Sequence, residues 1–233
     1  MKTNILCSDC TINCFIRQYC VPAQIGLVET EKNTTGYKKD EYIFREGDTV
    51  FGIYFIQHGG VKVISDNLNG RQQIVRLSKP GNILGYRALG KSRYYFNAVA
   101  LNDTTVCFIE NGLYHNLCRS NNDLAYNLML HYAHELGRTG LRMKFQSQMN
   151  VREKVAEAFV YFNEVFGLNP ATKTLNIPLS RQDIADLAGT TSEQVSRQLT
   201  EFEEEKLIIK NKRDIQIPDI RALEEIVKRY KIS

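Results

Sequence analysis

Short apolar runs separated by turn residues fill residues 37–110. Residues 42–44, 53–56 and 106–109 are such runs, and Gly, Pro, Asn and Asp gather between them. Strands bounded in this way, without intervening helical periodicity, are typical of antiparallel β structure. The pattern therefore predicts a β-barrel or β-roll rather than alternating strands and helices.

The hydrophobic period changes after this region. From Leu124 to Leu136 an apolar residue recurs every four positions, which predicts one apolar stripe on a long helix over 120–149. Asn122 or Asp123 is the expected N-cap. The stripe is expected to pack partly on the β domain of its own chain and partly against a partner helix in a dimer.

Near the C-terminus the spacing is that of a helix-turn-helix. Ser180 and Asp183 are placed for a capping box at the start of a first helix. Ala185 is small where two helices must approach closely, and Gly189 suits the left-handed turn that ends the helix. Val195, six residues further on, is expected to point into the core from the second helix.

The second helix, with Ser192 as its expected cap, has a polar face that predicts contacts with DNA. Arg197 can donate a bidentate pair to guanine, and Glu193 can accept from a cytosine amino group. Arg181 and Thr191 are better placed for phosphates. The alternative is a surface ion pair between Glu193 and Arg197. The predicted DNA-binding residues are Arg181, Thr191, Ser192, Glu193, Ser196, Arg197 and Thr200.

Helical and hairpin signals flank this motif. Asn150 and Glu153 form a second candidate capping box at the start of a helix. Downstream, the apolar residues of 207–210 and 215–218 flank a basic turn, which predicts a β-hairpin whose tip can touch the DNA backbone. A closing helix is expected over 219–230.

Composition narrows the function classes. The chain is 43% hydrophobic and 24% charged, and its net charge of +4 permits binding to nucleic acid without requiring it. No apolar run approaches the roughly 20 residues of a membrane span. With no signal-peptide stretch at the N-terminus, a cytoplasmic protein without a membrane partner is expected. No Ser/His/Asp set, paired carboxylates or phosphate-binding glycine loop indicates an enzyme.

Four of the six cysteines, Cys7, Cys10, Cys14 and Cys20, fall within fourteen residues. In a cytoplasmic chain, such a cluster indicates a metal site or a redox device rather than a disulfide framework. A thiol redox enzyme that uses Cys7 and Cys10 is a less favoured alternative, because that motif usually needs a helix N-terminus to lower the thiol pKa.

Distributed motifs resemble the CRP/FNR family of bacterial transcription regulators over nearly the whole chain. The recognition helix matches the family pattern Glu-x-x-Ser-Arg, and four further stretches match elsewhere. The matching stretches are Tyr42-Ile43-Phe44-Arg45-Glu46-Gly47-Asp48, Gly60-Val61-Lys62-Val63, Pro80-Gly81-Asn82-Ile83-Leu84-Gly85, Leu179-Ser180-Arg181-Gln182-Asp183-Ile184-Ala185 and Glu193-Gln194-Val195-Ser196-Arg197.

This resemblance implies an α+β fold in four parts. A cysteine-rich segment over 1–36 precedes a cyclic-nucleotide-binding-type β-roll over 37–119. A dimerisation helix over 120–149 leads to a winged helix-turn-helix over 150–233. The resemblance also implies a homodimer on palindromic double-stranded DNA, with half-sites like TTGA in the FNR branch, and contacts to RNA polymerase.

The sensor residues depart from those of the cyclic-AMP-binding members. Those members place a Glu after the glycine of the phosphate cassette and an Arg-Ser pair further on, which suit the ribose and the cyclic phosphate. Here Gly85 is followed by Tyr86, and Arg93 by Tyr94. Cyclic AMP is therefore not expected, and the stretch after Gly85 is closer to the FNR branch.

FNR-type sensors hold a [4Fe–4S] cluster through three N-terminal cysteines and one in the β-roll. The resemblance makes Cys7 and Cys10 the start of that motif, Cys20 its end and Cys107 the distant ligand. Nine residues separate Cys10 from Cys20, more than in the family. Cys14 is thus a third cluster ligand, a zinc ligand or a spare thiol. Zinc and metal-free thiols are the alternatives, and Cys107 alone also suits a buried apolar role.

A different sensor on the same DNA-binding fold is the other alternative. Four aromatic residues close to the expected pocket suit a small organic effector. They are Tyr86, Tyr94, Tyr95 and Phe96.

Overall fold

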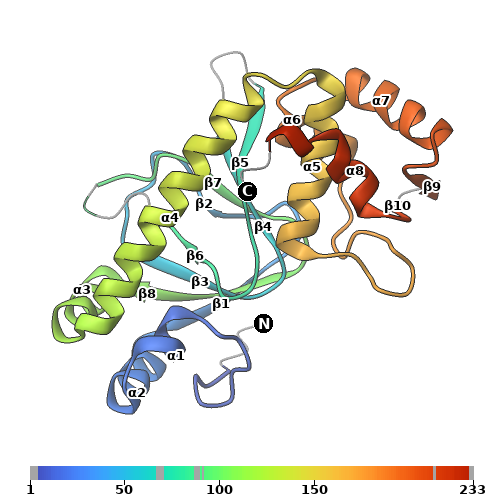
Figure 1. Cartoon of the computed structure of the whole chain (residues 1–233). Coiled ribbons are helices and arrows are strands. Elements are labelled where there is room, and N and C mark those ends of the chain that lie inside the picture. Colours follow the sequence, from blue (N-terminus) through green and yellow to red (C-terminus); the bar gives the residue numbers. More distant parts are fainter. Residues whose placement is uncertain (1–4, 67–70, 87–89, 91, 212–213, 231–233) are drawn as a thin grey trace. The chain divides into compact units, whose positions relative to one another are not determined.

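Two four-stranded sheets form a β-roll in the first half of the chain (Figure 1). The computed structural model describes residues 5–66, 71–86, 90, 92–211 and 214–230. One sheet has the order β1 (Asn33–Tyr37), β8 (Thr104–Glu110), β3 (Gly52–His58) and β6 (Ile83–Leu84). The other has the order β2 (Tyr42–Phe44), β7 (Asn97–Ala100), β4 (Val61–Asp66) and β5 (Gln72–Ser78). The expected antiparallel roll is therefore confirmed.

The first strand begins before the expected start of the roll. Thr34 pairs with Cys107 and Tyr37 with Thr104, so β1 opens at Asn33 rather than at residue 37. Because β1 carries threonines and a glycine instead of alternating large apolar residues, the hydrophobic pattern does not reveal it.

Short helices that the hydrophobic pattern did not predict pack on this roll. They are α1 (Phe15–Tyr19), α2 (Pro22–Glu31) and α3 (Asn111–Ser120). Ile16 and Val28 from the first two, and Leu117 from the third, are buried in one cluster with Ile53 and Ile109 of the roll. Burial of these side chains anchors the cysteine-bearing segment to the sheet that contains β8 (Figure 1).

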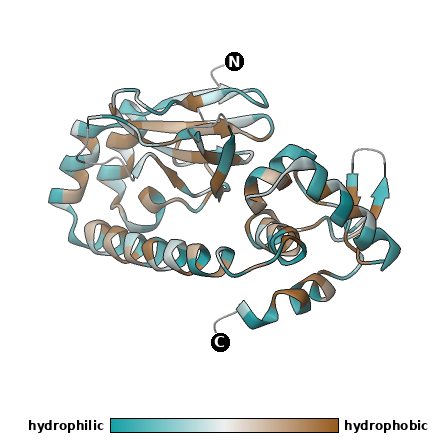
Figure 2. Ribbon diagram, turned by 90° about the horizontal axis from the view of Figure 1, so that it is seen from above, coloured by the Kyte–Doolittle hydropathy of each residue, from teal (hydrophilic) through white to brown (hydrophobic). Residues whose placement is uncertain are grey.

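The long helix α4 (Asn122–Gln146) is continuous, and its cap lies one residue earlier than expected. Asn121 Oδ1 accepts from the backbone N–H of Leu124 at 2.9 Å, whereas Asn122 and Asp123 are already inside the helix. Leu124 is buried, but Leu136 is 76% exposed. Hydrophobic residues recur along the whole helix (Figure 2). The stripe thus divides into a part covered by its own chain and a part left exposed.

Residues 139–233, together with 66–75, form a second compact unit. Its elements are α5 (Val151–Phe166), α6 (Arg181–Ala188), α7 (Ser192–Glu204), β9 (Ile209–Asn211), β10 (Asp214–Gln216), α8 (Ile220–Ile226) and a 3₁₀ turn (Lys228–Tyr230). Phe159, Phe162, Phe202 and Leu223 fill its core. The predicted hairpin is β9–β10, and the basic residues at its tip, Lys212 and Arg213, lie outside the described residues. Among the described residues, no helix is long and apolar enough to cross a membrane.

Candidate functional site

The turn between α6 and α7 has the geometry that the sequence spacing predicts. Ser180 Oγ accepts from the N–H of Asp183 at 3.0 Å, and Asp183 Oδ2 accepts from the N–H of Ser180 at 3.0 Å. Gly189 ends α6 in the left-handed region at φ 64°. Ala185 and Val195 are fully buried where the two helices meet. The two helices are therefore held at a fixed angle by local contacts.

The cap of α7 differs from the expected one. Thr191 Oγ1 accepts from the N–H of Gln194 at 3.3 Å, so Thr191 is the N-cap and Ser192 is the first helical residue. Ser192 instead donates its hydroxyl to Gln182 Oε1 at 2.8 Å, which ties α7 to α6. Gln182, which the sequence analysis missed, has no spacing signal because it acts through a side chain on the neighbouring helix.

The predicted DNA-binding residues divide by exposure. Arg181, Glu193, Arg197 and Thr200 are exposed, whereas Thr191, Ser192 and Ser196 are half-buried. Hydrogen bonds occupy the Ser196 and Thr200 hydroxyls, which donate to backbone carbonyls one turn earlier. The charged side chains are therefore the ones available to base edges and phosphates.

Arg197 does not pair with Glu193. Its Nε lies 3.8 Å from Glu201 Oε1, one turn further along α7, in a pair that is well exposed. The hydroxyl of Thr191 and the helix N-terminus lower the pKa of Glu193, which keeps that carboxylate charged. A loose, exposed pair of this kind costs little to break when a stronger partner arrives.

Four cysteines from two distant segments line one cavity beside α1 and the roll. Cys7, Cys10 and Cys14 come from the N-terminal segment, and Cys107 comes from β8. The cavity holds about 410 Å³ of space, including space open to solvent, and its other walls are mainly apolar. Cys20 does not line it. The N-terminal segment also approaches the roll closely: a Cβ on Gly81 (φ +90°) would lie 3.2 Å from the carbonyl oxygen of Asn13.

Burial raises the pKa of the Cys14, Cys20 and Cys107 thiols. Desolvation is the main cause for Cys14 and for Cys107, and the neighbouring thiols Cys7 and Cys10 add to the rise in both. Burial raises the pKa of Cys20 to about 11, with smaller contributions from Cys14 and Cys118. All six cysteines are free thiols. Because their pKa values are raised, Cys14, Cys20 and Cys107 keep their protons at neutral pH unless a metal binds them.

The spacing of the thiols is informative about their possible ligand. Among the described residues, no three His, Cys, Asp or Glu side chains are grouped closely enough for a single metal ion. A zinc site brings every thiolate to about 2.3 Å from the same ion, whereas in a [4Fe–4S] cluster each thiolate binds its own iron.

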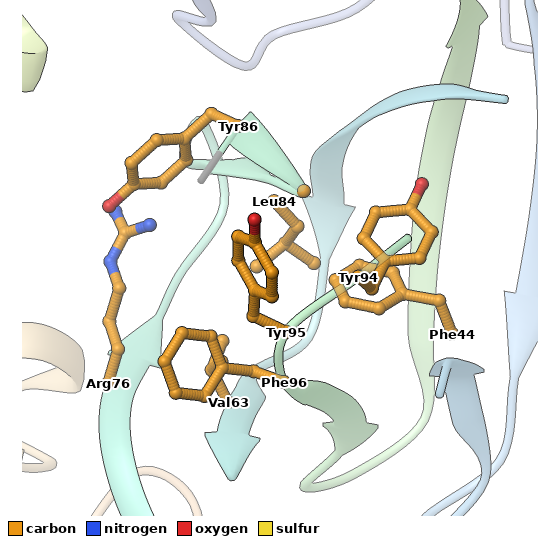
Figure 3. A pocket seen from close by; sticks show the side chains of 9 residues that line it. Phe44, Val63, Arg76, Leu84, Tyr86, Tyr94, Tyr95 and Phe96 are labelled. Atoms are coloured by element: carbon orange, nitrogen blue, oxygen red, sulfur yellow. The ribbon is translucent and has the colours of Figure 1, made fainter. Parts of the chain in front are cut away.

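A second cavity lies inside the roll (Figure 3). The four aromatic residues expected to form a pocket all line it, together with Phe44 and Arg76. Tyr94 stacks on Phe44 with 4.0 Å between ring centroids, and its hydroxyl donates to the Gly52 carbonyl at 2.9 Å. Arg93 is not among the lining residues and donates to the Gly47 carbonyl.

Arg76, which the sequence analysis missed, joins this cavity to α4. Its Nε lies 3.0 Å from Glu135 Oε2, and its guanidinium also donates to the Ile83 carbonyl and faces the ring of Tyr86. The Tyr86 hydroxyl donates to the same Glu135 oxygen at 3.0 Å. Arg76 was missed because its partner lies on an element remote in sequence.

An aromatic cluster links α4 to the thiol segment. Phe15, which follows Cys14, meets the His131 ring edge-on at 5.0 Å between centroids. Tyr132, the next residue of α4, stacks on Tyr86 at 5.1 Å. Burial lowers the pKa of His131, so this imidazole is neutral at physiological pH. The cysteine segment, α4 and the wall of the second cavity are thus in one contiguous packing arrangement.

Comparison with known proteins agrees with both halves of this architecture. Residues 34–121 match the family model "Cyclic nucleotide-binding domain", and residues 153–226 match "Crp-like helix-turn-helix domain". Together, in this order, they decide the family. The chain belongs to the CRP/FNR family.

Relatives in the CRP/FNR family are transcription regulators. The transcriptional activatory protein AadR of Rhodopseudomonas palustris is 29% identical over 206 residues, which cover 86% of this chain and 85% of AadR. The transcriptional activator protein Anr of Pseudomonas protegens is 25% identical over 220 residues, covering 91% and 88%. The structure of FixK2 from Bradyrhizobium japonicum has the same fold, with a TM-score of 0.74, 24% identity and coverage of 84% of this chain and 96% of that one.

Membership of the CRP/FNR family gives the two halves their roles. The protein is a sequence-specific DNA-binding transcription regulator of the CRP/FNR type, and its relatives include the transcriptional activator proteins Anr and FnrA. The α6–α7 motif is its DNA-binding element. The roll is the half that matches the cyclic nucleotide-binding domain.

Proposed function

We propose that this regulator works in the cytoplasm as a homodimer on palindromic DNA and responds to oxygen or redox state through a [4Fe–4S] cluster. Cys7, Cys10, Cys14 and Cys107 are its ligands in this proposal. One observation carries it: these four thiols, from segments remote in sequence, line a single cavity. The cluster supplies an oxidisable group, and the four thiolates hold it.

The proposed ligand set contains Cys14 in place of Cys20. Cys14 lines the thiol cavity, whereas Cys20 is buried in the core of the unit. We therefore assign Cys20 and Cys118 to packing.

The homodimer is supported by the exposed part of α4. Tyr126, Met129, Leu136 and Met143 are each more than half exposed, although they are large and apolar. Their spacing of three or seven residues places them along one side of the helix, as in a coiled-coil seam. Such a stripe on a regulatory helix suits a second copy of the same helix.

The path from the cluster to the DNA-binding unit begins at Phe15. A cluster acts as a switch only if its presence changes contacts in one of two conformations. Phe15 follows a proposed ligand directly and packs on His131 of α4. When Cys14 is released, this contact is lost, and α4 is free to change its packing. In this proposal the DNA-bound dimer also contacts RNA polymerase, as the resemblance to the family implies.

Iron content tests the proposal through a matched pair of variants. Wild type and Cys20→Ser, purified without oxygen, are expected to contain about four irons and matching sulfide per chain. Cys14→Ser and Cys107→Ser are expected to lose both. If Cys20→Ser loses iron while Cys14→Ser keeps it, the ligand set is wrong. If all four proteins lack iron and wild type contains one zinc, the cluster itself is wrong.

A second candidate sensor is supported by the aromatic cavity of the roll. A small effector that enters between Tyr86 and Tyr95 would disturb Arg76, whose partner Glu135 is on α4. A wild-type protein that stays colourless and iron-free after anaerobic reconstitution favours this candidate. The same protein would then show an effector-dependent rise in DNA affinity that Glu135→Gln abolishes.

A further inference from the structure

A buried cation faces the four thiols. Lys32, the residue after α2, is only 6% exposed and lines the thiol cavity. Its ammonium donates to the carbonyl of Ile5 at 2.7 Å. Among the described residues, no carboxylate forms an ion pair with it. A buried ammonium without a counter-charge is costly, so its position calls for a negatively charged group in the cavity.

Polar donors around the cavity point to the same kind of ligand. Gln57 is 8% exposed, and its Nε2 donates to Cys10 Sγ at 3.8 Å, while its buried Oε1 has no hydrogen-bond partner in the described part of the chain. The Thr34 hydroxyl lies 3.9 Å from Cys107 Sγ. Arg17 lines the cavity from an exposed position. Among the described residues, the lining includes Gln57 and the two cations Lys32 and Arg17 but no Asp or Glu.

We propose that Lys32 is the charge-compensating residue of the thiol site and makes the bound cluster harder to oxidise. This inference rests on the proposed function. A cluster with four thiolate ligands carries a net negative charge, which the buried ammonium balances. When dioxygen takes one electron from the cluster and becomes superoxide, the site becomes less negative. A fixed positive charge beside it opposes that loss.

The low exposure of Lys32 strengthens its effect. A cation in solvent is screened by water and salt, but a buried one is screened much less. Lys32 also counteracts part of the burial effect on Cys107, whose pKa it lowers. The exposed Lys39 therefore serves as a control for loss of one positive charge without burial.

The test compares Lys32→Met, Lys32→Gln, Lys32→Arg and Lys39→Met. Each is purified without oxygen, assayed for iron, checked for folding by far-ultraviolet circular dichroism, and titrated anaerobically with the one-electron oxidant ferricyanide while its visible absorbance is followed. For Lys32→Met and Lys32→Gln we expect the one-electron equilibrium to shift tenfold toward the oxidised form, about 59 mV. The same two variants should bleach faster in air, and the other two should match wild type.

The outcomes separate this inference from the proposed function. Loss of iron in folded Lys32→Met and Lys32→Gln, with iron retained in Lys32→Arg, also supports the role of Lys32. Arginine keeps the positive charge that methionine and glutamine lack. A wild-type midpoint in iron-replete Lys32→Met overturns it, and so does loss of iron in Lys32→Arg. Absence of iron from wild type instead overturns the cluster proposal.

Discussion

The helix-turn-helix and the thiol cavity are assembled over very different distances in the sequence. In the first, a capping box, a left-handed glycine and one buried side chain on each helix lie between Ser180 and Val195. In the second, Cys14 meets a cavity whose opposite wall is Cys107 on β8, with most of the roll between them in sequence. The first site needs only its own helices; the second exists only when the whole roll has formed.

This difference predicts that the helix-turn-helix and the thiol cavity respond independently to substitutions. A local motif keeps its geometry when a remote site changes, because its capping and packing contacts are internal. A site built from distant segments depends on the packing that joins them, here the cluster that buries Ile16 and Val28 against the roll. Substitutions in the two regions should therefore separate DNA affinity from iron content.

The largest effect is expected on DNA affinity, from Arg197→Ala. Arg197 is exposed on the face of α7, and loss of a bidentate contact to guanine costs about 1–3 kcal/mol, or roughly 5- to 150-fold in affinity. Fluorescence anisotropy with a palindromic duplex carrying TTGA half-sites measures it, and iron content should not change.

Arg181→Ala is the matched control for Arg197→Ala. A phosphate contact positions the protein without reading sequence, so its loss should weaken specific and unrelated duplexes alike. Equal loss on both duplexes for Arg197→Ala would contradict its assignment to base recognition.

The contrast between the regions also explains what the sequence could reveal. Spacing from Ser180 to Gly189 encodes a capping box and a helix end directly, so the turn and its angle were predictable. Lys32 carries no such signal, because its role depends on the fold bringing α2 beside β8. The choice between Cys14 and Cys20 is equally non-local: the family resemblance made Cys20 the end of the motif and left Cys14 open, and the cavity lining favours Cys14. The cap of α7 was misplaced by one residue because Thr191 and Ser192 both suit that position.

A smaller effect is expected on the stability of α6 from Ser180→Ala, which removes the local capping box. The N–H of Asp183 loses its acceptor, and the cost of losing an N-cap is about 1 kcal/mol. Amide hydrogen exchange in α6 should quicken accordingly, while exchange in β8 and the iron content stay at wild-type levels. Equal acceleration in both regions would show that the two halves unfold as one unit.

The smallest effect is expected on the pH dependence of stability, from the pair of Glu157 and Arg142 inside the DNA-binding unit. Glu157 of α5 lies 3.6 Å from Arg142 of α4, and burial, the largest cause, raises the Glu157 pKa even though Arg142 lowers it. Arg142 also faces the Tyr161 ring at 4.0 Å, and its three nitrogens have no hydrogen-bond partner among the described residues.

Because the folded state binds the Glu157 proton more tightly than the unfolded state, stability falls as pH rises from the ordinary value of 4.5 through the raised pKa. Glu157→Gln removes this dependence, so its free energy of unfolding should fall less steeply over that window. Urea unfolding followed by circular dichroism at a series of pH values measures the difference, since the chain contains no Trp for fluorescence. Parallel curves for the two proteins would mean that the ion pair with Arg142, rather than burial, sets the protonation of Glu157.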